Sequence, residues 1–593
     1  MKTPQGILET SKPVGTPVEW SSSAPDVSDG RVPLMLGVTG MRTIEHPARA
    51  KEVVVEQMRR LKRRYPNTPF AILSALAPGA DQMVARAALD VLDAQLFVPL
   101  PMPLASYRET FATDAARQQF GALLDVASSV IELERDPEAG TPAKPGTRYE
   151  VQYARAAAFI TDRCQILFAL HDGTAERTSQ DRVGTATIIE WVEDGRIPLA
   201  YLPTESQDRP FYYPNETQCL HISPRTGTVN RLEDVYGAIA PSLERIDRFN
   251  ADIGELPPAA VEQSRRYIVG DHGDHAALQT PSVRALTQRY VHADALAMTL
   301  KSRFHQYLRG VYALSAGAII TFPLIEVWVY SMMFSFLFAA LAVGIVVWTR
   351  QCDMENRFLH ARALAEGLRI ATFWSIAGLP DHVHDHFINK YAGHLAWTRL
   401  ALQNVETVSR MGMQGHAIEA NYELVEILWV ADQCKYFGRA QYQTRNLAQR
   451  LDRGANLLLG CVLVYAVGVF TYLWAGTSWT PPTIQLMAIG IEMPLAFAVS
   501  LKAYKSKLGL EPLLRHYEKA YLLFETAHQE LQAHRSHRIV QDATGSPSME
   551  RPVDSPSGAS RREVLVQLGE EAILENGEWL WMNQNRNIET PAL

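Results

Sequence analysis

The chain has 593 residues, a net charge of −7 and an isoelectric point near 6.2. This length is too great for a single hydrophobic core, so several domains are expected. The acidic balance argues against a nucleic-acid-binding protein, which needs a basic face. Nucleic acid is therefore not expected among the partners.

The first 30 residues are rich in Ser, Thr and Pro and contain no apolar stretch. They predict a disordered lead-in and no cleaved secretory signal. Five cysteines are scattered along the chain without CxxC spacing. Structural disulfides and a cysteine-based zinc site are therefore not expected.

Apolar runs alternate with helical patterns from Val32 to Leu202, within a segment assigned to residues 31–240. This alternation is typical of a parallel sheet covered by helices on both faces, and it predicts an α/β Rossmann-like N-terminal domain. The predicted strands are LMLGVTG, FAILSAL, AQLFVPL, SSVIELE, QILFALHDG and IPLAYL, at residues 34–40, 70–76, 94–100, 128–134, 165–173 and 197–202.

Open parallel sheets bind ligands outside the carboxyl ends of their strands, so the loops that follow the strands are the candidate site. Glycines there let the backbone approach a phosphate, and hydroxyl or guanidinium groups can bond its oxygens. In the alternative interpretation these glycines only cap strands and helices. The candidate ligand-binding residues are Gly37, Thr39, Gly40, Arg42, Ser74, Gly79, Ala80, Asp81, Asp172, Gly173, Gly184, Thr185, Thr187 and Glu190.

Four segments of this region together resemble the SLOG superfamily: GVTGMR, SALAPGADQMVARAA, a strand that ends in DG, and a helix that starts with GTAT and precedes IPLAYL. The resemblance implies recognition of a nucleotide or nucleotide-derived ligand, of the cyclic or ADP-ribose type. Some members are hydrolases that use the glutamate of a GGxGTxxE motif. Here Glu190 and Thr187 keep the spacing, but Val183 and Ala186 replace two glycines, which favours binding over catalysis. Glu190 could equally be a solvated helix residue.

Two apolar segments, at residues 310–349 and 454–501, contain one charged residue each, Glu326 and Glu492. A helical pass needs about 20 apolar residues, so each segment is long enough for two passes and a turn. The sequence predicts an all-α membrane region with four transmembrane helices in two hairpins and cytoplasmic helical extensions. Lys and Arg flank the passes, whereas both predicted outer turns contain none. This bias predicts a multi-pass inner-membrane protein with both termini in the cytoplasm.

Charged helical patterns flank both hairpins. ALAEGLRIATFW, WVADQCKYF and LGEEAILENGEWLWMNQNR resemble the SLATT group of two-span effector modules, although a second hairpin departs from its plain pattern. The resemblance implies a membrane effector that forms homo-oligomers and permeabilises the bilayer when its sensor is engaged, as in bacterial anti-phage systems.

Two polar features within the helical half allow more than one interpretation. Glu492 could line a conduction path, or it could be protonated and hydrogen-bonded to a neighbouring span. His382, His384 and His386 alternate, which would align them for a metal on a strand. The surroundings predict a helix or a loop, where this spacing scatters them, so no metal site is expected.

The predicted organisation follows from these segments. It comprises a lead-in (1–30), the SLOG-like domain (31–240), a helical connector (241–300), a first transmembrane hairpin (301–350), a cytoplasmic helical region (351–452), a second hairpin (453–502), a cytoplasmic helix (503–540), a linker (541–562) and a C-terminal helix (563–593).

The leading functional hypothesis is a membrane effector, not an enzyme, that is gated by a nucleotide-derived second messenger and requires no cofactor. A membrane-tethered nucleotide hydrolase that uses Glu190 is the alternative. A constitutive channel ranks third, because it leaves the N-terminal sheet without a role.

Overall fold

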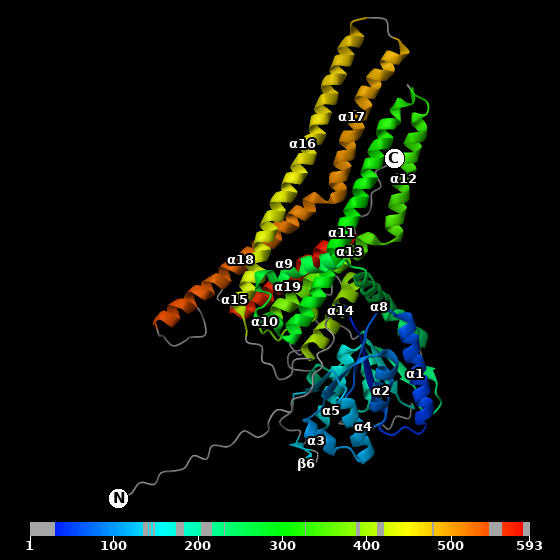
Figure 1. Ribbon diagram of the computed structural model, residues 1–593, viewed down its shortest axis with the longest axis vertical. Coiled ribbons are helices and arrows are strands. Elements are labelled where there is room, and N and C mark those ends of the chain that lie inside the picture. The colour runs from blue at the N-terminus through cyan, green and yellow to red at the C-terminus, as the bar shows by residue number, and fades with distance from the viewer. Residues whose placement is uncertain are drawn as a thin grey trace.

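The structure is a computed structural model of the chain (Figure 1). It describes residues 30–134, 140–141, 144–145, 149–172, 183–202, 216–230, 232–326, 328–386, 392–411, 420–476, 480–544 and 560–584.

The N-terminal part is a seven-stranded sheet in the order β4-β3-β2-β1-β7-β8-β9. All neighbouring strands pair in parallel except β9, which is antiparallel to β8. The chain runs outward from β1 through β2 and β3 to β4 and then returns to place β7 on the other side of β1. The strands are β1 (Leu34–Gly40), β2 (Phe70–Leu73), β3 (Gln95–Leu100), β4 (Ser129–Glu132), β7 (Ile166–Leu170), β8 (Gln218–Ile222) and β9 (Val229–Asn230), with a separate ribbon of β5 (Gly140–Thr141) and β6 (Lys144–Pro145).

Helices cover both faces of this sheet, which confirms the predicted parallel α/β architecture. Alternate residues of β1 belong to two cores: Leu34 and Leu36 pack with one set of helices, while Met35 packs with another. The first set includes α1 (Pro47–Arg64), α2 (Ala80–Leu92) and α4 (Asp114–Leu124), and the second includes α5 (Tyr149–Arg163) and α6 (Thr185–Glu193); the short α3 (Leu104–Glu109) precedes α4.

The sixth predicted strand is wrong. Leu199–Tyr201 form a short 3-10 turn, η2, instead of a strand. Pro198 has no backbone N–H to donate to a ladder. The place beside β7 is taken by β8, at Gln218–Ile222, which the sequence analysis did not identify.

Beyond the sheet the described chain is almost entirely helical. Its helices are α8 (Leu232–Gly254), α9 (Pro258–Val269), η3 (Gly270–His272), α10 (Ala276–Gln279), α11 (Pro281–Thr321), η4 (Pro323–Glu326), α12 (Ser331–Gln351), α13 (Met354–Ile376), η5 (Val383–His386), α14 (Ala392–Met411), α15 (Tyr422–Val425), a π-helical turn η7 (Glu426–Ala431), α16 (Asp432–Trp474), α17 (Pro481–Leu508), α18 (Leu510–Thr544) and α19 (Arg561–Gln584).

In the part of the chain that the structure describes, four helical segments are long and apolar enough to cross a membrane, in agreement with the predicted number. Their most apolar 18-residue stretches have mean hydropathies of 1.5 to 2.2, and at most 11% of such a stretch is buried. Side chains this apolar and this exposed are typical of helices that cross a membrane. The segments lie within Pro281–Ile325, Ser331–Gln351, Tyr422–Trp474 and Thr483–Arg535.

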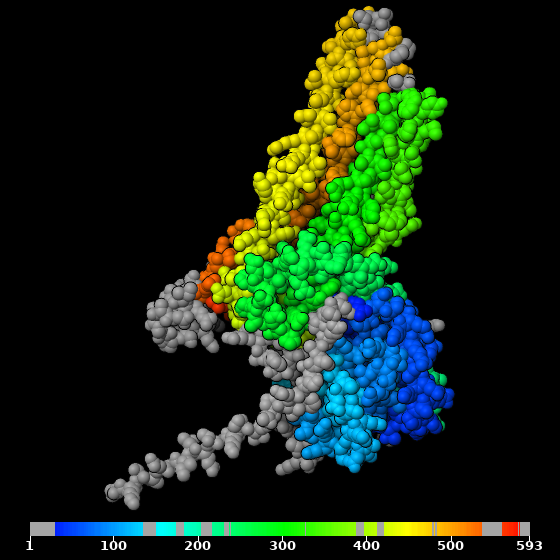
Figure 2. Space-filling model, in the orientation of Figure 1, coloured from blue at the N-terminus to red at the C-terminus, as the bar shows by residue number. Residues whose placement is uncertain are grey.

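The apolar stretches project from one end of the molecule as two pairs, α11 with α12 and α16 with α17 (Figures 1 and 2). The Ser335 hydroxyl of α12 donates to the Ala318 carbonyl of α11 at 2.9 Å. At the base, the Tyr312 ring of α11 meets the Tyr504 ring of α17 edge-on, with 4.9 Å between ring centroids. Helices α11 and α16 continue without a break from the polar base into the apolar stretches.

The helical base is attached to the amino-terminal edge of the sheet. The amide of Asn404, on α14, donates to the carbonyl of Pro33, directly before β1, at 2.8 Å. Its oxygen accepts from the Gln165 side chain, directly before β7, at 2.7 Å. On α8, Asn250 pairs with the backbone of Val32 at 2.8 and 2.9 Å. The carboxyl-terminal edge, where the candidate ligand loops lie, is therefore opposite the membrane helices.

Candidate functional site

The candidate site lies where β1 and β7 end side by side. The chain leaves β1 toward one side of the sheet and reaches β7 on the other, and open α/β sheets bind ligands at such a switch point. Gly40 pairs with Leu170 in the ladder, and the Met41 N–H donates to the Leu170 carbonyl at 3.1 Å. The loops after β1 and β7 thus flank one position at the carboxyl edge.

Gly40 and Gly79 allow the predicted loops after β1 and β2 to pack closely together. A Cβ atom at Gly40 would lie 2.5 Å from the Cβ of Ala80, so a side chain there would push β1 away from α2. Gly79 has φ +91°, and a Cβ at this position would lie 2.4 Å from the Arg42 carbonyl oxygen. The Ala80 N–H closes the contact by donating to the Met41 carbonyl at 3.1 Å. Both positions require glycine because the segments around them pack so closely.

Asp81 is buried beneath these loops. The Ala77 N–H donates to its carboxylate at 3.4 Å. Burial raises the pKa of Asp81 to about 7, although the Ala77 amide and the Arg42 charge act in the opposite direction. The Asp81 carboxyl is therefore partly protonated near pH 7, and its protonated form can donate as well as accept. Ser74 supports the same loop, because its Oγ accepts from the Leu76 N–H at 3.1 Å.

Arg42 is the cation of the site. Its side chain is exposed, and its guanidinium lies 5.5 Å from the centroid of the Tyr153 ring of α5. A guanidinium held over a ring and open to solvent can bind a phosphate or carboxylate in bidentate fashion.

Not every predicted residue faces this position. Gly37 lies within β1, where a Cβ would be 2.7 Å from the Cys164 sulfur, so its role is packing. Thr39 is buried in the same strand. Asp172 is occupied structurally: it accepts from the Ser223 hydroxyl at 2.9 Å and from the Arg225 N–H at 3.0 Å. Gly173 lies outside the described residues.

The predicted GTAT segment begins α6. Gly184 is its N-cap, and a Cβ there would have no neighbour within 4 Å, so packing does not demand a glycine at this position. Thr185 and Thr187 are partly exposed in the first turn, and Glu190 is exposed one turn later. The first amides of a helix lack partners within it and attract anions.

In α17, Glu492 is exposed on the single chain. Gly490 faces α16, since a Cβ there would lie 2.6 Å from the Tyr465 ring. Two residues on a helix are separated by roughly 200°, so Glu492 points away from α16.

The histidine cluster is more compact than the sequence analysis anticipated. Side-chain ligand atoms of His382, His384 and Glu406 lie within 4.8 Å of one another, all buried. Two imidazoles and a carboxylate are a donor set that zinc accepts. The Glu406 carboxylate, however, already accepts from the Val383 N–H (2.9 Å), the His384 N–H (3.2 Å) and His384 Nδ1 (2.6 Å). These bonds make Glu406 the anchor of η5, and His386 turns away to pair with Glu570 at 2.7 Å.

The sequence carried no signal for Glu406, because it is 22 residues from His384 and lies in an ordinary helical pattern.

Comparison with known proteins adds no family to these observations: no protein-family model matches the chain, and no curated protein matches it.

Proposed function

We propose that the chain is a membrane effector in which a nucleotide-derived ligand at the sheet domain controls the membrane helices. One observation supports this proposal most directly: β1 carries the Gly40–Arg42 loop at one end and meets α14 through Pro33 at the other. Seven residues of strand span about 23 Å. Strand β1 is therefore a short and stiff connection through which a change at the ligand loops can reach the helical base.

The proposed binding mode places the phosphate groups of the ligand between Arg42 and the first turn of α6. Arg42 supplies the charge and the α6 amides supply donors, while Gly79 lets the loop after β2 pack against the backbone of Arg42. The buried carboxyl of Asp81 fixes the shape of the Gly79 loop. Within this proposal the domain is SLOG-like and Rossmann-like, as the sequence resemblance implies, and the ligand is a cyclic or ADP-ribose type nucleotide.

In the proposed membrane arrangement the two helical pairs are transmembrane hairpins. The sheet and the helical base lie at the same end of all four apolar helices (Figure 1). The Lys and Arg residues that flank these helices lie toward that end as well, for example Arg309 and Lys502. The positive-inside rule then puts the base and both termini in the cytoplasm, at the bacterial inner membrane.

Glu492 supports assembly into a homo-oligomer. A charged side chain near the bilayer centre costs about 3 kcal/mol or more when it faces lipid. Since Glu492 points away from α16, a second copy or a water-filled path between copies is the environment that would accommodate it. The conducting or membrane-disrupting state would then be an oligomer whose helices rearrange when ligand binds.

The test of ligand gating uses the purified full chain in liposomes. We expect leakage of a trapped dye on addition of a cyclic or ADP-ribose type nucleotide, and about tenfold weaker sensitivity to it in Arg42→Gln, because a charged hydrogen bond is lost. Arg59→Gln, an exposed arginine of α1, is the matched control and should behave as wild type. Leakage that no such nucleotide stimulates would contradict the proposal.

The hydrolase alternative is tested in the same samples. Chromatography of the nucleotide after incubation with wild type and Glu190→Ala would reveal release of a base. The effector proposal expects intact nucleotide in both samples, while base release that Glu190→Ala abolishes would favour the tethered enzyme.

The role of Glu492 is tested by conductance in planar bilayers. We expect Glu492→Gln to lower the ligand-stimulated conductance or change its ion selectivity, because a charged side chain on the path attracts cations. Glu326→Gln, the other acidic residue of the apolar segments, should leave both unchanged. Equal effects of the two substitutions would place Glu492 away from the path.

A further inference from the structure

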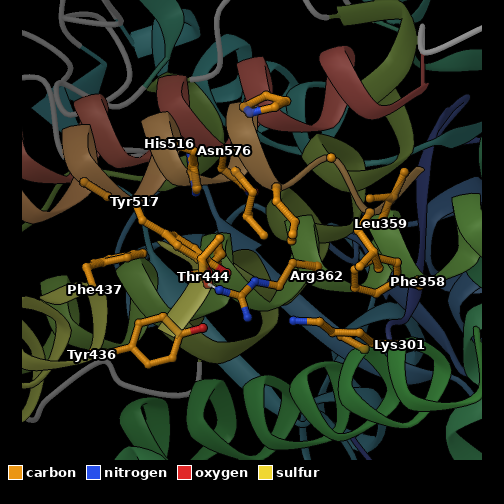
Figure 3. Close-up of a pocket in the computed structure, with 18 of the residues that line it drawn as sticks. Lys301, Phe358, Leu359, Arg362, Tyr436, Phe437, Thr444, His516, Tyr517 and Asn576 are labelled. Atoms are coloured by element: carbon orange, nitrogen blue, oxygen red, sulfur yellow. Dashed lines mark ion pairs between the residues drawn. The ribbon is translucent and has the colours of Figure 1, made fainter. Parts of the chain in front are cut away.

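A cavity of about 560 Å³ lies in the helical base, where the two apolar pairs begin (Figure 3). Its walls come from α11, α13, α16, α17, α18 and α19. On α11 its last lining residue is Arg309, directly before the apolar stretch, and on α17 it includes Tyr504 and Lys507, directly after the other one. The volume is typical of small-molecule sites.

Positive charge exceeds negative charge in this cavity. Four Lys and Arg side chains line it, against three glutamates. Lys301, His305 and Arg309 are spaced four residues apart, so they form a row on one side of α11. The four cations are Lys301, Arg309, Arg362 and Lys507, and the three glutamates are Glu355, Glu366 and Glu575.

Two of the three glutamates pair with cations of the same cavity, and the third pairs with a lining histidine. Glu366 pairs with Arg362 at 2.6 Å and with Arg369 at 2.8 Å. Burial would raise the pKa of Glu366, but these two guanidinium groups outweigh it and the pKa is lowered, so the carboxylate is charged. Glu575 pairs with His516 at 2.8 Å, and Glu355 lies 3.7 Å from the Lys507 ammonium.

Lys301 and Arg309 lack such a partner. Among the described residues neither side chain is in an ion pair. Figure 3 shows the Lys301 ammonium pointing toward the Arg362 guanidinium across the cavity. Two cations that converge in a partly buried space repel each other, and an anion between them would relieve this repulsion.

The rest of the lining is apolar and aromatic. Phe437, Tyr517 and Phe524 of α16 and α18 form one side, and Phe358 and Leu359 of α13 form another. A ligand that fits must therefore combine an anionic group with an apolar body.

We propose that this cavity is a second ligand site that binds a phosphate-bearing amphiphile. The phosphate lies between Lys301 and Arg362, and the apolar body lies against the aromatic side chains of α16 and α18. Basic pockets between membrane helices at the cytoplasmic surface suit anionic lipid headgroups, and a nucleotide offers the same phosphate chemistry with an aromatic base. This site is distinct from the one at the carboxyl edge of the sheet.

The position of this cavity gives the bound amphiphile a structural role. Its walls belong to both apolar pairs, α11 of the first and α16 and α17 of the second. Occupancy therefore favours the arrangement of the two pairs in which the cations and the aromatic wall face each other.

The test measures thermal unfolding of the delipidated full chain in detergent. The probes are dioctanoyl phosphatidic acid, dioctanoylglycerol as the same amphiphile without phosphate, inorganic phosphate, and AMP. Phosphatidic acid should raise the melting temperature, and its dissociation constant should be about tenfold weaker in Lys301→Gln. Lys301→Arg should retain binding, and Arg303→Gln, an exposed cation on the same helix outside the cavity, should match wild type.

Each outcome supports or overturns the site. Stabilisation by AMP that Lys301→Gln abolishes and Arg42→Gln leaves intact would support it, with a soluble nucleotide as the source of the phosphate. Three results would overturn it. Dioctanoylglycerol could stabilise the protein as much as phosphatidic acid does, or Arg303→Gln could weaken binding as much as Lys301→Gln does. The third is that phosphatidic acid does not stabilise the protein and that any stabilisation by AMP is lost in Arg42→Gln. Because Lys301 is in no ion pair, Lys301→Gln is expected to fold, and its melting temperature without ligand checks this.

Discussion

Asp81 gives the ligand edge of the sheet a titratable group near neutral pH. Its carboxyl is only 8% exposed and lies under the loop whose shape depends on Gly79 and on the approach to Arg42. A proton held on Asp81 lets it pack there without a full buried charge. The protonation state of Asp81 is therefore coupled to the conformation of the Gly79 loop.

We expect folding stability to fall as pH rises from about 4 to about 7, because the unfolded chain releases the Asp81 proton near pH 4 while the folded chain keeps it to about 7. The upper limit of this contribution is about 4 kcal/mol. In Asp81→Asn this contribution is absent, so its melting temperature should rise relative to wild type with increasing pH. Thermal unfolding across this range checks the difference, and parallel pH profiles for the two proteins would contradict it.

The sequence patterns predicted most of the loops at the carboxyl-terminal edge of the sheet, but not the side-chain contacts that support those loops. Gly40 ends β1, and Arg42 and Gly79 lie in loops after strands that their apolar runs make recognisable; these loops do meet. The structural roles of Gly37 and Asp172 depend on Cys164 and Ser223, which are distant in sequence. A local pattern carries no information about such partners.

At the scale of elements, the long periodic and apolar segments were predictable, and short elements were not. The five-residue strand β8 has little pattern to distinguish it, and its place beside β7 is a long-range choice. The histidines of η5 were predicted to scatter, yet Glu406 binds two successive N–H groups there and brings His382 and His384 together. Both differences arise from tertiary contacts.

Helix α19 is secured to the base by a glycine. A Cβ at Gly569 would lie 2.4 Å from the ring of Trp374, whose indole N–H donates to the Leu565 carbonyl at 3.1 Å. Trp374 is fully buried on α13 and has no room to yield. Among the contacts that dock the C-terminal helix, this one is so close that only glycine allows it.

Gly569→Ala should therefore loosen α19 and destabilise the base by about 1–3 kcal/mol, although alanine is the better helix former. Hydrogen exchange of the α19 amides checks this: protection should fall in Gly569→Ala and remain in Gln567→Ala, an exposed position on the same helix. Unchanged protection in both variants would show that Trp374 can move aside.

At the scale of the whole molecule, Asn404 joins the sheet to the helices. It is fully buried and bonds the segments that precede β1 and β7, the two strands that carry the candidate ligand loops. The opposite ends of the same strands therefore hold the candidate ligand site and the attachment to the base.

Asn404→Leu should separate ligand binding from membrane leakage. It leaves the Gln165 side chain without its Asn404 partner, at a cost of about 1–3 kcal/mol, while the carboxyl edge is untouched. We expect the proposed nucleotide to bind as it does to wild type and to cause less leakage. Loss of binding to the same extent as leakage would assign Asn404 a role in folding alone.

Helix α16 also has a mechanical consequence. It runs for 43 residues, or about 65 Å, and only its far half is apolar. If α16 tilted as a straight rod about its polar end by roughly 5°, its far end would move by about 6 Å, close to one helical turn. Motions too small to open a cleft in the base are then large enough to change which side chains meet at the far ends of the apolar helices.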